Sequence, residues 1–128
     1  MQYGFSKSVD LPYEQAIDKV TTELKKEGFG VLTEIDVQAT LKKKLDVDFR
    51  KYKILGACNP PFAYKALQTE SRIGTMLPCN VIVQETEGDC IEISAVDPVA
   101  SMQAIKNESL AEIAGQVRSR LQRVIANL

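Results

Sequence analysis

The chain has 128 residues and a formal net charge of −1, from 16 lysines and arginines against 17 aspartates and glutamates. It contains no histidine, which excludes the Ser-His-Asp triad, the Cys-His dyad and the HExxH zinc site. The near-neutral charge argues against a nucleic-acid partner, because phosphate contacts require a basic excess. We expect no membrane partner either, since no apolar stretch approaches the roughly 18 residues that span a bilayer.

The spacing of apolar residues predicts alternating strands and helices along most of the chain. In chain order these are a strand over residues 2–8, a helix over about 12–27, a strand over 29–35, a short helix after Asp36, a strand over 52–58, a helix over about 61–71, strands over 80–86 and 90–95, a short helix over 98–105, and a final helix with an apolar stripe from Leu110 to Ile125.

Side chains that commonly cap helices precede four of these helices. The candidates are Asp10 before Pro12, Asp36, Asp97 before Pro98, and Ser109 with the capping-box spacing to Glu112.

The strands alternate apolar and polar residues, as in a sheet that is covered on one face only. Residues 80–95 also read as a hairpin with Glu87-Gly88-Asp89 as its turn, which requires an antiparallel pair. The sequence therefore predicts an α+β fold, in which a curved antiparallel or mixed sheet of about five strands carries helices mainly on one face. No linker or repeat interrupts residues 1–128, so we expect a single domain.

An uncovered sheet face that is partly apolar would favour a homodimer. The aromatic residues that such a surface could use are Tyr3, Phe5, Phe49 and Tyr52. The alternative is that these four side chains belong to the core, and the sequence does not decide between the two.

Two short segments place a cysteine and an asparagine beside proline at the end of a predicted strand. The first is Gly56-Ala57-Cys58-Asn59-Pro60-Pro61, and the second is Pro78-Cys79-Asn80. Strand ends beside rigid turns often carry binding groups, and a thiol with a carboxamide offers a soft ligand together with hydrogen-bond donors and acceptors. If the two strand ends are close in space, they would face one pocket.

The alternative interpretation of these segments is structural. Cysteine often behaves as a small buried hydrophobe, and asparagine at a strand end often bonds its own backbone. The third cysteine, Cys90, follows the hairpin turn, and we expect it to be structural.

A reactive cysteine would need a group that lowers its pKa. For Cys58 that group could be the N-terminus of the helix after Pro60-Pro61. Three widely spaced cysteines without a CxxC motif make neither a disulfide framework nor a zinc site, and they suit the reducing cytoplasm. We assign no catalytic residue and no metal ligand, and the sequence favours a binding protein over an enzyme.

Four segments together resemble the bacterial and archaeal family known as domain of unknown function 302. They are Gly28 to Ile35, Tyr52 to Pro60, Leu77 to Val81 and Ser94 to Pro98, and the resemblance covers nearly the whole chain. It implies a compact α+β domain with a curved antiparallel sheet, similar to the TATA-binding-protein-like class, that pairs as a dimer. It implies neither DNA binding nor an established activity.

Six residues match the characteristic segments of that family and form the candidate ligand site. They are Cys58, Asn59, Pro78, Cys79, Asn80 and Asp97. We expect a cytoplasmic, non-enzymatic homodimer that binds a small ligand near the Cys-Asn segments, with no cofactor named by the sequence. Two alternatives stay open: a purely structural or partner-binding dimer with core cysteines, and a thiol-based redox or metal-handling protein that uses Cys58 and Cys79.

Overall fold

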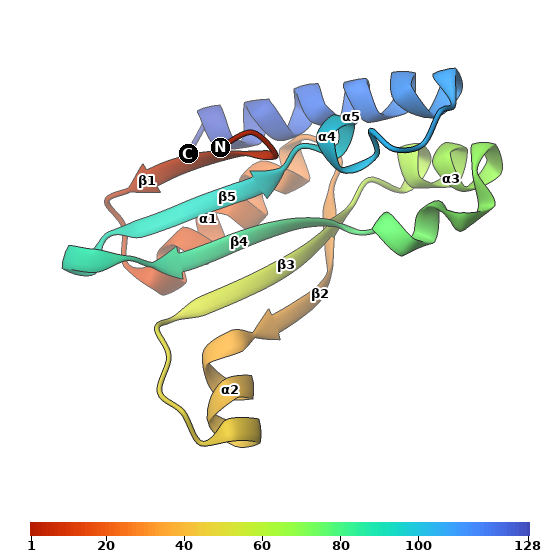
Figure 1. The fold of residues 1–128 in the computed structure, drawn as a ribbon. Coiled ribbons are helices and arrows are strands. Elements are labelled where there is room, and N and C mark those ends of the chain that lie inside the picture. The colour runs from red at the N-terminus through yellow and green to blue at the C-terminus, as the bar shows by residue number, and fades with distance from the viewer.

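Five strands form one sheet in the order β1-β5-β4-β3-β2, and every neighbouring pair is antiparallel (Figure 1). The computed structural model describes residues 1–128. The strands are β1 (Gly4–Val9), β2 (Gly30–Asp36), β3 (Tyr52–Cys58), β4 (Cys79–Glu85) and β5 (Ile91–Val96). The helices are α1 (Tyr13–Lys26), α2 (Val37–Leu45), α3 (Pro60–Thr69), α4 (Pro98–Ser101) and α5 (Glu108–Ala126), with short 3-10 helices η1 (Ser71–Met76) and η2 (Glu87–Asp89). The α+β prediction is confirmed, and the sheet is antiparallel rather than mixed.

The helices cover one face of the sheet. On β5, Ile91, Ile93 and Ala95 are buried beneath α1 and α5, whereas Glu92 and Ser94 lie on the opposite face. No helix crosses the face that is turned toward the viewer in Figure 1. The alternation of apolar and polar residues along the strands therefore predicted the covered face correctly.

Two of the four predicted helix caps are confirmed. The Asp36 carboxylate accepts a hydrogen bond from the Ala39 backbone N–H at 2.9 Å, and Asp97 accepts one from the Val99 N–H at 2.9 Å. Asp10 caps nothing: α1 starts after Pro12, too far along the chain for the Asp10 carboxylate to reach its first N–H groups.

The predicted cap of α5 is wrong by two residues. The helix begins at Glu108, and the Asn107 side chain accepts a hydrogen bond from the Leu110 N–H at 3.2 Å. Ser109 therefore lies inside the first turn, where its side chain does not serve as the cap.

The short helix predicted over residues 98–105 ends early. The α4 helix stops at Ser101, and the backbone N–H of Met102 bonds to Pro98 and Ala100. The chain then crosses to α5 through a loop that contains Ile105. Residues 72–78, which the sequence suggests are a plain connector, are largely occupied by η1.

The second strand and helix form an arm at the edge of the molecule. The register of β2 against β3 shifts between Val31 and Thr33, so Leu32 sits at a bulge. None of the α2 residues is buried, and α2 makes its main contacts with β2 and β3 (bottom of Figure 1). No helix in the structure is long and apolar enough to span a membrane.

The buried apolar residues form two separate clusters. The main cluster of 18 residues lies between the sheet and the helices α1 and α5. The minor cluster of five residues lies under α3, η1 and α4, and consists of Ala66, Ile73, Met102, Leu110 and Ala114. Helix α5 contributes to both clusters, and members of both line a cavity.

Candidate ligand-binding site

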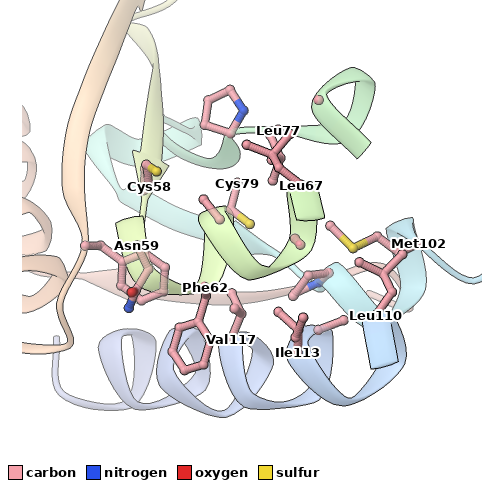
Figure 2. Close-up of a pocket in the computed structure, with 18 of the residues that line it drawn as sticks. Cys58, Asn59, Phe62, Leu67, Leu77, Cys79, Met102, Leu110, Ile113 and Val117 are labelled. Atoms are coloured by element: carbon pink, nitrogen blue, oxygen red, sulfur yellow. The ribbon is translucent and has the colours of Figure 1, made fainter. Parts of the chain in front are cut away.

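An apolar cavity of about 330 Å³ lies where the two hydrophobic clusters fail to meet (Figure 2). Its walls come from the ends of β3 and β4, from α3, and from the N-terminal half of α5, with η1 and α4 closing one side. Of its 19 lining residues 15 are hydrophobic, and none carries a charged side chain. Four of the six residues singled out by the sequence line this cavity: Cys58, Asn59, Pro78 and Cys79.

Strand pairing brings the two Cys-Asn segments together. Ala57 in β3 and Cys79 in β4 are register partners, so the end of β3 lies beside the start of β4. Gly56 allows β3 to pack closely against its neighbours there. A Cβ at this position would lie 2.7 Å from Cγ of Pro78 and would collide with Oγ1 of Thr33. The two strand ends are therefore close in space, which is the condition set from the sequence, and Cys58, Asn59, Pro78 and Cys79 line one cavity.

The carboxamide of Asn59 makes a structural hydrogen bond to the backbone. Its Nδ2 donates a hydrogen bond to the backbone oxygen of Glu27 at 3.2 Å, at the turn that follows α1. Arg120 donates to the same oxygen at 3.0 Å, and its guanidinium lies over the Phe62 ring. Asn59 therefore ties the start of α3 to the end of α1 and fixes one end of the cavity.

The two thiols of the cavity are set up to remain protonated. Burial raises the pKa of Cys58, and burial together with the nearby Cys58 raises the pKa of Cys79 to about 11. The helix N-terminus beyond Pro60 therefore does not give Cys58 a lowered pKa. A nucleophilic cysteine needs a shift in the opposite direction, so these thiols act as apolar wall at neutral pH.

All three cysteines are free. Cys90 is exposed, so the expectation that it is a structural residue is wrong: the hairpin turn places it outside both clusters. No group of three or more cysteine, aspartate or glutamate side chains is placed to hold a metal ion.

Two of the predicted site residues lie elsewhere. Asn80 follows Cys79 on β4, so its side chain points to the other face of the sheet, where it is exposed. Asp97 caps α4 and accepts a hydrogen bond from Nε of Arg118 at 3.0 Å, so both of its oxygens are occupied by structural partners. Its neighbour Pro98 lines the cavity instead.

Most of the cavity wall was not recognised as a site from the sequence. The apolar residues that surround it include Phe62, Leu67, Leu77, Met102, Leu110, Ile113 and Val117. They belong to helical stripes and a connector, and an apolar stripe looks the same whether it meets another side chain or an empty space. One signal was available: the apolar stripe of α5 is long enough to contribute residues to both clusters.

The uncovered face of the sheet contains a second, more polar concavity of about 360 Å³. Tyr3, Tyr52 and Asn80 line it, and Tyr3 is exposed. Phe5 points to the other face, where it packs against the main cluster. The four aromatic residues therefore divide. Phe5 packs against the core, whereas Tyr3 and Tyr52 lie on the uncovered face. Phe49 is half-buried in the segment before β3, with its ring centroid 6.2 Å from that of Tyr52, and belongs to neither apolar cluster.

Together these features define a class: a small α+β domain with one five-stranded antiparallel sheet, helices on one face and an apolar pocket beside the sheet. The chain belongs to the family described as "Domain of unknown function DUF302", whose model matches residues 5–128. The resemblance seen in the sequence is thereby confirmed.

A solved structure shares this fold. The chain is similar to the protein described as "Crystal structure of uncharacterized conserved protein DUF302 from Bacillus stearothermophilus", with a TM-score of 0.91 and 28% sequence identity over 98% of each chain. No curated protein matches the chain. Family membership thus establishes the fold and brings no specific activity with it.

Proposed function

We propose that this protein is a non-enzymatic binding module whose apolar cavity holds an uncharged small molecule, or the uncharged part of a larger one. The observation that carries the proposal is the cavity of about 330 Å³ between the two hydrophobic clusters. Protein interiors pack so densely that voids larger than a water molecule are few. A well-formed apolar pocket of this size is the usual form of a ligand site.

The size and lining of the cavity limit what it can hold. A cavity of roughly 150 Å³ with aliphatic and aromatic walls holds benzene, so this one accepts a molecule about twice as large. Because no charged side chain lines it, a carboxylate or ammonium group would lose its hydration without gaining a partner. Any charged group of the ligand therefore has to remain at the mouth, in water.

Two exposed lining residues mark where the cavity reaches solvent. Leu32 lies beside the β2 bulge and has 67% of its surface exposed, and Leu67 on α3 has 45% exposed. Exposed apolar side chains at the mouth of a pocket are suited to contact the part of a ligand that projects from it.

Binding of the uncharged fluorophore N-phenyl-1-naphthylamine tests this proposal. The wild-type protein is expected to enhance its fluorescence saturably at one site per chain. Ala63→Phe extends a ring from α3 into the cavity and is expected to abolish binding without lowering the free energy of unfolding. Ala39→Phe, at an exposed position on α2, is the matched control and should bind normally. No saturable binding by the wild type, or normal binding by Ala63→Phe, would overturn the proposal.

The thiol-based alternative has less support. The raised pKa values of Cys58 and Cys79 oppose both nucleophilic chemistry and metal ligation, which require the thiolate. Native mass spectrometry of protein purified without reductant or chelator distinguishes the two functions. Loss of two hydrogens or a bound metal would favour the thiol-based alternative, and a bound organic molecule would favour the binding module.

We assign the uncovered face of the sheet to a second copy of the chain, which would make the protein a homodimer. Arg50 and Glu92 lie on this face and are joined through Gln84: Nε of Arg50 donates to Oε1 of Gln84 at 3.0 Å, and Nε2 of Gln84 donates to Oε1 of Glu92 at 3.2 Å. Neither charge has an ion-pair partner within the chain.

A twofold axis would supply both missing partners, since it places Arg50 of one copy opposite Glu92 of the other. The half-buried apolar side chains Ile54 and Ile82, which are register partners on the same face, would be covered in that arrangement. The structural dimer considered from the sequence would use this same face without a ligand. For the location of the protein we propose the cytoplasm, because three free cysteines, one of them exposed, suit a reducing compartment.

A further inference from the structure

A second cavity of about 220 Å³ adjoins the apolar pocket. It lies between α5 and the loop that follows α4, and is itself lined mostly by apolar residues. Three residues line both cavities: Met102, Leu110 and Ala114. These three side chains therefore form the wall that separates the two spaces.

Met102 is the part of this wall that does not belong to α5. Leu110 and Ala114 are fixed on α5, whereas Met102 follows the four-residue helix α4 and begins a loop. A methionine side chain is unbranched, has three rotatable bonds and adapts to irregular gaps. Shortening this side chain would open the wall while leaving the two α5 positions unchanged.

Met102 also marks the closed end of the pocket. In Figure 2, Cys58 and Asn59 lie at one end of the site, and Met102 lies at the other beside Leu110. The exposed Leu32 is close to the thiol end, because its neighbour Val31 pairs with Ala57. Met102 is only 8% exposed. A molecule that enters beside Leu32 therefore reaches Met102 with its far end.

We propose that the ligand is an unbranched aliphatic chain with its polar end at the mouth, and that Met102 sets the longest chain the pocket accepts. The inference rests on the proposed binding function. Methylene groups suit a site with no charged lining, and the adjoining cavity lies where a longer chain would continue. With Met102 in place the chain stops at this wall, and without it the chain extends into the second cavity.

A series of primary alcohols from hexanol to tetradecanol tests this inference, with affinity read from displacement of N-phenyl-1-naphthylamine. In the wild type each added methylene is expected to tighten binding about fourfold, up to a limiting length beyond which affinity falls. Met102→Ala should move that limit to longer chains, by about two methylenes or more. Met76→Ala is the matched control, because Met76 packs on the minor cluster but lines neither cavity.

Two further variants test whether Met102→Ala acts by opening the second cavity or only by destabilising the protein. Ala111→Leu fills the second cavity, and should leave the wild-type limit unchanged but cancel the shift caused by Met102→Ala. If Met102→Ala does not fold, Met102→Val should shift the limit in the same direction by less.

The outcomes separate the two proposals. If alcohols displace the fluorophore from the wild type but no chain length is limiting, Met102 does not set the limit and the binding function stands. The same holds if there is a limiting length that Met102→Ala does not change. A wild type that binds neither the fluorophore nor any alcohol overturns the binding function itself.

Discussion

The three cysteines show how one residue type takes different roles within one small fold. Cys79 is buried in the wall of the pocket, Cys58 is half-buried beside it, and Cys90 is exposed after the hairpin turn. Burial favours the neutral thiol, so the first two titrate above their ordinary value. The environment, rather than the presence of a cysteine, therefore decides which thiol is reactive.

The raised pKa of Cys79 predicts a loss of stability at high pH. Its pKa is 9.0 in ordinary surroundings and about 11 in the folded protein. The stabilisation is fully present below pH 9 and is lost as the pH rises toward 11, because the thiolate is favoured by the unfolded state. Between pH 8 and 10.5 the thiol should cost the wild type about 2 kcal/mol of unfolding free energy, measured by guanidinium denaturation.

Comparison between variants isolates this effect from other groups that titrate at high pH. Cys79→Ala should remove that part of the pH dependence, and Cys90→Ser should retain it, because Cys90 is exposed. Equal pH dependence in Cys79→Ala and the wild type would contradict a raised pKa at this position.

Asp97 illustrates a residue whose sequence context suits two roles. An aspartate before proline at a strand end fits both a helix cap and a ligand contact. The structure uses one oxygen for the Val99 N–H and the other for Arg118. The capping role was visible in the sequence, but the partner was not, because Arg118 is 21 residues away on α5.

At the scale of elements, the start of α5 depends on one side chain. Asn107 accepts from the Leu110 N–H and also donates from Nδ2 to the Thr69 backbone oxygen at 3.3 Å. It therefore caps α5 and ties that helix to the end of α3, and both helices form walls of the pocket. The cap is thus part of what holds the site in shape.

Replacing this cap is predicted to destabilise the protein more than replacing the serine that the sequence favoured. Asn107→Ala should cost about 1–2 kcal/mol of unfolding free energy, since it removes a cap and an interhelical hydrogen bond. Ser109→Ala should change it by less than about 0.5 kcal/mol. Urea denaturation of the two variants measures both values, and a larger cost for Ser109→Ala would refute the assigned cap.

At the scale of the whole molecule, the two sheet faces differ in what covers them. Helices α1 and α5 bury one face, whereas the exposed Arg50 and the half-buried Glu92 lie on the other face without ion-pair partners. The net charge of −1 means that two copies repel each other little. A second copy would complete both charge pairs at once.

Charge reversal tests the homodimer. Sedimentation equilibrium is expected to show a dimer for the wild type. Arg50→Glu and Glu92→Lys should each weaken it by at least about tenfold, because like charges then face each other across the axis. The double variant should recover most of the lost affinity. The proposed interface would be contradicted if the wild type is a monomer, or if the double variant dimerises no more tightly than the single variants.

Several features followed from the sequence alone because their causes are local. Alternation along the strands and the apolar stripe of α5 predicted the elements and their buried faces, since side-chain direction repeats every two or 3.6 residues. The same alternation could have separated Asn80 from Cys79, because neighbours on a strand point to opposite faces.

The pocket, by contrast, was decided by the tertiary structure. Whether Met102 and Leu110 contact other side chains or enclose a space depends on how far α3 and α4 stand from the sheet, and residues distant in the chain fix that distance. Apolar character favours the burial of a side chain but does not specify which surface the side chain will contact. The sequence by itself therefore determined the elements and the covered face of the sheet, whereas only the three-dimensional packing decided that the core divides and leaves a cavity between its parts.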